Sequence, residues 1–129
     1  MREPHERALA LLGVPFRPQG RDPEIGLDCV GVVLWVFQIK EADAPRYRLS
    51  DGDWEQVLRA VGRWFEPVIG GKACSGDLVV FRLSRSFHFG VISGSNLIHA
   101  DLAVGKVTAR RLPARLGREC RLFRYRGDS

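Results

Sequence analysis

Cysteine and histidine are scarce in this sequence, which has three residues of each type among 129. The cysteines stand at positions 29, 74 and 120, and no Cys-x-x-Cys or His-x-x-x-His pair occurs, so a zinc site is not expected. An odd number of cysteines without regular spacing also argues against a disulfide framework. We interpret Cys74 and Cys120 as buried packing residues.

Long apolar runs are also lacking. No stretch reaches the about 20 residues that a membrane-spanning helix requires, and the charged residues 1–7 are not followed by the apolar core of a signal peptide. We therefore expect a protein that is synthesised in the cytoplasm without a signal peptide and that has no membrane partner. If it acts outside the cell, something else must carry it there.

Hydrophobic residues make up 45% of the chain and charged residues 27%, which excludes a disordered or fibrous protein. The length suits one domain with its own core, so residues 1–129 are expected to form a single domain. The net charge of +5 is weighted towards C-terminal arginines. It would suit nucleic acid, an anionic envelope polymer or an acidic protein. Solubility alone also explains it, and nucleic acid is only the minor alternative.

The stretch 27–40 is predicted to form a buried helix around which the chain is organised. Between Cys29 and Ile39 almost every residue is apolar, and the length favours a helix, although the β-branched residues would also suit a strand. Asp28 is the expected N-cap. Cys29 would then lie in the first turn, where the helix dipole and free N–H groups lower a thiol pKa. A lone cysteine here is, however, most often a packing residue.

Two further helices are predicted. The first spans residues 3–13, followed by an extended segment, a turn at residues 21–23 and a sharp bend at Gly26. Its buried face carries Ala8, Leu11 and Leu12. The second begins at Ser50 or Asp51 and ends by Pro67. Its apolar stripe has helical spacing and is expected to pack in the core: Trp54, Val57, Leu58, Val61, Trp64 and Phe65.

After Gly76-Asp77 the pattern changes to short strands with turn residues between them. Such spacing predicts an antiparallel meander, and helices followed by strands indicate an α+β domain. The predicted strands are 78–83, 88–93, 96–101, 106–112 and 120–126.

Residues 94–95 form the predicted two-residue loop of a hairpin. The register predicts four pairs: Ser93–Asn96, Ile92–Leu97, Gly90–His99 and His88–Asp101. Because side chains alternate across a strand, His88 and His99 share one face as diagonal neighbours. Gly90 is expected to leave space between them, and Asp101 lies directly across from His88.

A cysteine at a helix start and two converging histidines have the logic of a cysteine hydrolase. The thiolate of Cys29 would attack a carbonyl, one histidine would transfer the proton, and a third polar group would orient that imidazole. Each histidine alone would more often be a hydrogen-bonded, partly buried residue. The set of three favours a site, and Asp101 is an alternative orienting group.

Five sequence blocks, in order and at compatible spacing over residues 11–101, resemble the NlpC/P60 cysteine peptidases. The blocks are Leu12-Gly13-Val14-Pro15-Phe16, Gly26-Leu27-Asp28-Cys29-Val30-Gly31-Val32-Val33, Gly76-Asp77-Leu78-Val79-Val80-Phe81, His88-Phe89-Gly90-Val91-Ile92 and Leu97-Ile98-His99-Ala100. The resemblance implies a papain-like α+β fold. It also implies hydrolysis of peptidoglycan stem peptides, commonly after D-γ-glutamate, without a metal or organic cofactor.

By position, the resemblance makes Cys29 the nucleophile, His88 the general base and acid, and His99 the orienting residue. It places Asp28, Phe16 and Gln19 at the substrate. Asp28 would meet a free amine of the stem peptide.

Two positions depart from the family pattern. Phe16 stands where tyrosine is usual and lacks the hydroxyl expected near the reacting carbonyl, so backbone N–H groups must stabilise the transition state. Val30 replaces a usual serine and puts the familiar amine-binding specificity in doubt.

The short chain is similar to the phage-type branch of the family, found in tail modules of bacteriophages and gene transfer agents. This analogy implies tail or baseplate proteins as partners and incorporation in the tail of a particle. Two alternatives are kept: a structural tail or hub subunit with little activity, and a thiol amidase or acyltransferase acting on another substrate.

Overall fold

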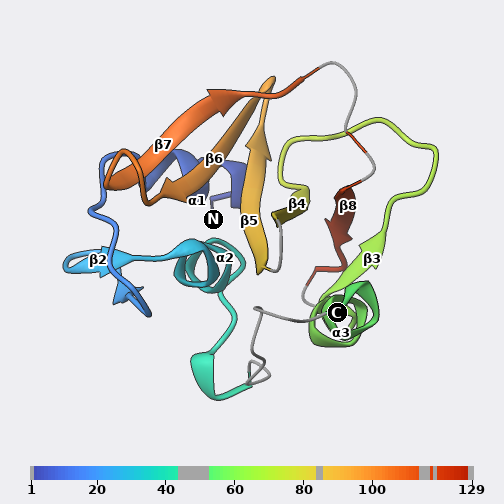
Figure 1. Ribbon diagram of the computed structural model, residues 1–129, viewed down its shortest axis with the longest axis horizontal. Helices are drawn as coiled ribbons and strands as arrows, with labels where there is room; N and C mark the ends of the chain where they lie inside the picture. The colour runs from blue at the N-terminus through green and yellow to red at the C-terminus, as the bar shows by residue number, and fades with distance from the viewer. Residues whose placement is uncertain (1, 44–52, 84–85, 114–116, 118, 128–129) are drawn as a thin grey trace.

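The structure is a computed structural model that describes residues 2–43, 53–83, 86–113, 117 and 119–127. Within these residues, six strands form one antiparallel sheet in the order β3-β8-β4-β5-β6-β7. Their bounds are β3 Phe65–Pro67, β4 Leu78–Leu83, β5 Ser86–Ser93, β6 Asn96–Asp101, β7 Lys106–Arg111 and β8 Cys120–Tyr125. Helices packed on this sheet make an α+β fold, as predicted (Figure 1).

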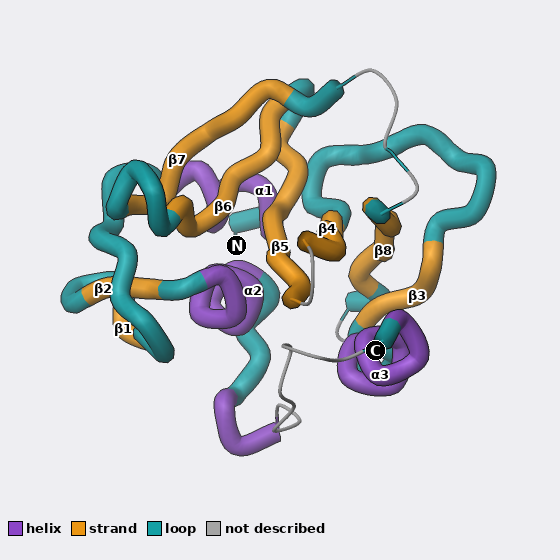
Figure 2. Tube along the Cα trace, viewed as in Figure 1, coloured by secondary structure: helices purple, strands orange, loops and turns teal. Residues whose placement is uncertain are grey.

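Three helices, a 3-10 turn and a short hairpin accompany the sheet in the described part of the chain. They are α1 Pro4–Ala10, β1 Arg21–Asp22, β2 Gly26–Leu27, α2 Cys29–Val36, η1 Glu41–Asp43 and α3 Trp54–Val61. Helix α2 lies between the β1–β2 hairpin and the sheet (Figure 2). The helix therefore contacts both of them.

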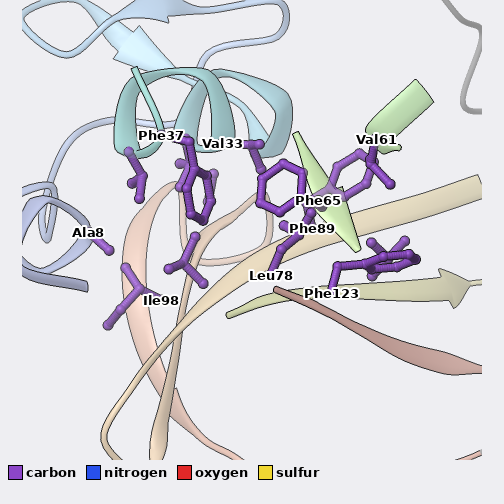
Figure 3. Close-up of a cluster of buried hydrophobic side chains, with 14 of the residues drawn as sticks. Ala8, Val33, Phe37, Val61, Phe65, Leu78, Phe89, Ile98 and Phe123 are labelled. Carbon is purple, nitrogen blue, oxygen red and sulfur yellow. The ribbon is translucent and has the colours of Figure 1, made fainter. Parts of the chain in front are cut away.

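The main core lies between the helices and one face of the sheet (Figure 3). Ala8 of α1 and Val33 of α2 pack there with Leu78, Phe89 and Ile98 of the strands. Strand residues with the opposite parity form a smaller apolar cluster of Val79, Ile92, Leu97 and Leu122. Both faces of the sheet centre are thus apolar, which explains the continuous apolar run in β4.

The N-terminal region differs from its prediction in two details. Helix α1 ends at Ala10, so Leu12 lies in the following turn and is 44% exposed instead of buried. The turn occupies residues 23–25, and Gly26 belongs to β2. A Cβ added at Gly26 would lie 2.7 Å from the Arg17 Cβ. This glycine therefore permits close packing of two chain segments and is not a bend.

Helix α3 starts later and ends earlier than predicted. Asp53 is its N-cap and accepts a hydrogen bond of 3.0 Å from the Gln56 amide, whereas Ser50 and Asp51 lie outside the described residues. The helix ends at Val61, and Phe65 begins the unpredicted strand β3. The Phe65 ring packs in the same core, with its centroid 4.7 Å from that of Phe37. Because its burial matches the helical stripe, the apolar spacing alone could not show that α3 ends and β3 begins before Phe65.

The meander prediction holds for β4 to β7 but is wrong for the last strand. Strand β8 crosses back to pair with β4, with Val79 opposite Leu122, and β3 pairs with its other edge. Arg124 of β8 forms a two-pronged ion pair with the buried Asp77, at 3.1 and 3.0 Å. This pairing gives β8 a specific place beside β4.

Cys74 is exposed, contrary to its predicted burial, and Cys120 is half-buried. In the described part of the chain, the helices are too short or too polar to span a bilayer.

Candidate active site

Cys29 is the first residue of α2, as predicted. The Asp28 carboxylate caps the helix by accepting a hydrogen bond of 2.8 Å from the Gly31 amide. A Cβ added at Gly31 would lie 2.2 Å from the Gly20 carbonyl oxygen. The segment before the hairpin therefore rests directly on the first turn of α2, the turn that contains Cys29.

The pKa of Cys29 is raised to about 11, so the expected thiolate-favouring environment is wrong. Burial is the main cause, and the neighbouring Asp28 carboxylate adds to it. The backbone N–H groups of Phe89 and Val30 favour the thiolate but do not outweigh burial. The contact with the Phe89 amide puts the sulfur against β5, one residue from His88. Among the described residues, no hydrogen bond joins the sulfur to an imidazole.

The two strand histidines meet side chain to side chain. His88 Nε2 and His99 Nδ1 lie 2.8 Å apart, and the ring planes are nearly perpendicular at 84°. The predicted pairs Ser93–Asn96 and Ile92–Leu97 are present, but the ladder between β5 and β6 ends at Val91–Ile98. Gly90–His99 and His88–Asp101 are therefore not ladder pairs. Leu97 fills the space above Gly90, since an added Cβ would lie 2.4 Å from its Cδ1.

Asp101 lies at the far side of His99 and not at His88. Its Oδ2 is 4.0 Å from His99 Nε2, a buried nitrogen without a hydrogen-bond partner in the described part of the chain. Its Oδ1 accepts hydrogen bonds from the amides of Ala103 and Val104 in the following turn. The carboxylate is thus held beside His99 by the β6–β7 connection.

Burial lowers the pKa of both histidines. The pKa of His88 falls to about 4 because of desolvation and the neighbouring His99, with Asp101 partly opposing the shift. The pKa of His99 is also lowered by desolvation and by Arg110, again against Asp101. Both imidazoles are therefore neutral near pH 7. His88 uses Nε2 towards His99, which leaves Nδ1 as the ring atom for a thiol proton.

The Asp28 carboxylate accepts more hydrogen bonds than its predicted role as a helix cap requires. Arg21 donates to its Oδ1 over 2.8 Å and the Gln19 amide donates to its Oδ2 over 2.9 Å. Arg21 was not among the predicted site residues. Its position follows from the β1–β2 hairpin, which pairs Arg21 with Leu27, next to Asp28. Prediction of a short hairpin around a turn at residues 23–25 would have placed Arg21 beside Asp28.

Phe16 and Gln19 border the same region. Phe16 is half-buried, pairs with Leu27 in an isolated bridge and packs against the main core. Gln19 has a φ of 58° and an exposed side chain. Left-handed backbone at a non-glycine residue is costly and is often found at functional sites. The described residues contain no cluster of three His, Cys, Asp or Glu side chains that could hold a metal ion.

Comparisons with solved structures identify this fold. The chain is similar to the peptidoglycan hydrolase RipB of Mycobacterium tuberculosis (TM-score 0.63, 21% identity, covering 94% of this chain and 62% of RipB). It is similar to the NlpC/p60 domain of the peptidoglycan hydrolase SagA (TM-score 0.56, 25% identity, covering 84% and 86%). It also resembles RipD of the same mycobacterium, described as a non-catalytic NlpC/p60 domain protein adapted to peptidoglycan binding (TM-score 0.62, 17% identity, covering 96% and 98%).

The chain spans less than two thirds of some of these relatives, including 41% of an NLP/P60 family protein from Staphylococcus aureus that is described as similar to lipoprotein. No curated protein sequence matches the chain significantly. The model of the NlpC/P60 family matches residues 13–119, a region that contains Cys29, His88 and His99. The protein therefore belongs to the NlpC/P60 family.

Proposed function

We propose that the protein is a cysteine peptidase that hydrolyses peptidoglycan stem peptides. The observation that carries this proposal is the 2.8 Å hydrogen bond between His88 and His99, beside a helix that begins at Cys29. Family membership supports the reaction class. RipB and SagA, both named as peptidoglycan hydrolases, support the substrate.

In this mechanism Cys29 and His88 start as a neutral thiol and a neutral imidazole. His88 Nδ1 takes the thiol proton as the sulfur bonds to the substrate carbonyl carbon, and His88 returns that proton to the departing amine. Water then attacks the thioester carbon while His88 takes a proton from it. The carbon–sulfur bond breaks, and His88 returns that proton to the sulfur, which leaves as a thiol. His99 accepts a hydrogen bond from His88 Nε2 and keeps Nδ1 directed at the thiol, while Asp101 favours the His99 tautomer with a proton on Nε2.

The developing oxyanion needs hydrogen-bond donors. Phe16 has no hydroxyl, so backbone N–H groups at the start of α2, including that of Cys29, are assigned this role. The Gly31 amide is already bonded to the Asp28 cap, but the amides of Cys29 and Val30 have no partner within the helix and are suited to the role.

The test is digestion of purified sacculi with fragment analysis by mass spectrometry. The wild type is expected to release stem-peptide fragments and Cys29→Ala none. Cys74→Ala is the matched control, because its exposed thiol lies outside the proposed site. Equal release by the wild type and Cys29→Ala, or no release at all, would reject hydrolysis.

We further propose cleavage after D-γ-glutamate and a place in a phage-like tail, with tail or baseplate proteins as partners. The support is the likeness to the phage-type branch. Fragment masses identify the bond, and isolation of tagged protein with or without tail proteins tests the location.

A non-enzymatic role as a structural tail or wall-binding subunit is the second candidate. It is favoured by Phe16, by the raised pKa of Cys29 and by the likeness to RipD, which is named as non-catalytic. Alkylation near pH 7 does not separate the two roles, because the Cys29 thiol is neutral and slow to react in both. Sedimentation with purified sacculi does: wild-type protein that binds sacculi and releases no fragments favours the structural role.

A thiol amidase or acyltransferase on another substrate is the third candidate, favoured by Val30 in place of the usual serine. Identification of the bond that is cut or formed decides between this activity and the peptidase.

A further inference from the structure

Arg21 and two backbone amides surround the Asp28 carboxylate. Arg21 Nη1 donates to Oδ1 over 2.8 Å, and the Gly31 amide donates to the same oxygen over 2.8 Å. The Gln19 amide donates to Oδ2 over 2.9 Å. Only 17% of the Asp28 side chain is exposed. The carboxylate is thus compensated by a full positive charge and has little capacity for a further donor.

The guanidinium itself keeps spare donors. Its Nη1 also donates to the Gly20 carbonyl over 2.8 Å, and Nε lies 3.8 Å from Glu41 Oε1. The Glu41 side chain is 70% exposed, so solvent and salt screen this ion pair. Nη2 of Arg21 has no hydrogen-bond partner in the part of the chain that the structure describes. It can donate to an oxygen atom of a substrate.

The neighbouring side chains do not favour an ammonium group either. Phe16 and Val30 are both half-buried and apolar, so neither offers an acceptor. An ammonium group approaching Asp28 would meet the Arg21 charge at contact distance. Like charges brought together at a desolvated site are strongly unfavourable.

We propose that Arg21 makes the subsite at Asp28 selective for a stem peptide whose amino end is acylated, and against one that ends in a free ammonium. The acyl carbonyl accepts a hydrogen bond from Arg21. This inference rests on the proposed peptidase function and names the substrate class of that same site. It replaces the expectation that Asp28 meets a free amine.

The experiment uses two synthetic stem peptides of identical sequence, one N-acetylated and one with a free amino end. The ratio of their kcat/KM values is measured for the wild type, Arg21→Gln and Arg17→Gln, and their Kd values are measured for Cys29→Ala. The wild type is expected to prefer the acetylated peptide by about tenfold or more. Arg21→Gln should bring the ratio to about one or below, because Asp28 then attracts the ammonium group.

Arg17→Gln is the matched control. It removes one positive charge from the adjoining exposed segment, and the Arg17 side chain has no ion pair with Asp28 among the described contacts. It should keep the wild-type ratio, and retained cleavage of the free peptide by Arg21→Gln shows that this variant is folded.

A wild type that cuts both peptides equally, or a ratio unchanged in Arg21→Gln, overturns the inference but leaves the peptidase standing. Selective binding of the acetylated peptide by Cys29→Ala, without cleavage by the wild type, supports the subsite and rejects the peptidase. Neither binding nor cleavage of either peptide overturns both.

Discussion

Cys29 and His88 differ from isolated side chains because folding shields both from much of the surrounding water, although each keeps an intermediate exposure. Burial raises the pKa of the Cys29 thiol to about 11 and lowers the pKa of His88 to about 4. The charged pair is therefore disfavoured relative to the neutral pair, since desolvation opposes both ionised forms. In the proposed reaction the proton moves during attack on the substrate and not before it.

The pH profile follows from these two shifts. Below about pH 4, His88 is protonated and cannot accept the thiol proton, so kcat/KM should fall there and stay level from about pH 5 to 8. Alkylation of Cys29 by iodoacetamide should instead keep rising towards pH 11, as thiolate forms. Initial rates of stem-peptide hydrolysis measure the acid limb of kcat/KM. Alkylation rates measure the formation of the Cys29 thiolate at high pH. An activity limb near pH 6.5 would contradict the buried neutral state of His88.

The negative charge of Asp101 raises the pKa of both His88 and His99. Asp101→Asn keeps an Oδ1 acceptor for the turn amides of Ala103 and Val104 but removes the charge beside His99. We expect kcat/KM to fall by about tenfold or more. The acid limb should move to lower pH, because Asp101 raises the pKa of His88 and His99. The pH dependence of kcat/KM is the measurement.

Asp101→Ala removes both the turn contact and the charge, and serves as the comparison. If Asp101→Asn has a wild-type pH profile while Asp101→Ala is unstable, Asp101 acts only through the turn.

At the scale of elements, α2 shows how a helix start depends on packing from outside the helix. Gly31 has a low helix propensity, and alanine at an exposed helical position would be stabilising by up to about 1 kcal/mol. Here the added Cβ would lie 2.2 Å from the Gly20 carbonyl oxygen. Backbone at that distance must move, which separates the 17–20 segment from α2.

Gly31→Ala is therefore expected to lower the free energy of unfolding by about 2 kcal/mol, because the steric clash exceeds the gain in helix propensity. Urea denaturation measures the change. Gly117→Ala is the control, because its added Cβ would meet nothing within 4 Å. A Gly31→Ala protein as stable as the wild type would show that the segment over α2 yields without cost.

Some helices and strands could be predicted from the sequence, and others could not. The Asp28 cap, the helix start at Cys29 and the first pairs of the β5–β6 hairpin depend on residues close in sequence, and they are observed. The shorter α3 and the strand at Phe65 were missed, because the stripe of apolar residues has the same spacing in both interpretations. Only the pairing of β3 with β8 separates them.

For the whole molecule, the placement of β8 joins β3 to the rest of the sheet at β4. Arg124 bonds both carboxylate oxygens of Asp77, whose side chain is only 3% exposed. Removing one partner of such a pair leaves a buried charge without its counterion. The ion pair therefore penalises any arrangement in which β8 does not lie beside β4.

Arg124→Met should lower the free energy of unfolding clearly more than the loss of an exposed ion pair does, because the Asp77 carboxylate, only 3% exposed, is left without its counterion. Arg126→Met, one residue beyond the end of the same strand, is the control. It removes an exposed ion pair with Glu66 at 3.8 Å and a hydrogen bond of 3.2 Å to the Phe65 carbonyl, and it leaves no buried charge without a counterion. The loss of free energy of unfolding should therefore be smaller. Urea denaturation of both variants tests the difference, and equal losses would contradict the special role of Asp77.

The sequence by itself determined the class of fold and the three residues proposed for catalysis. A capped apolar helix and a two-residue hairpin depend on residues that are close together in the chain, so they can be predicted from the sequence. Only the tertiary structure decided the return of β8 to β4, the position of Arg21 on Asp28 and the neutral state of Cys29 and His88. These features depend on segments distant in the chain. The burial and the electrostatic environment of a site depend on every segment that packs around it.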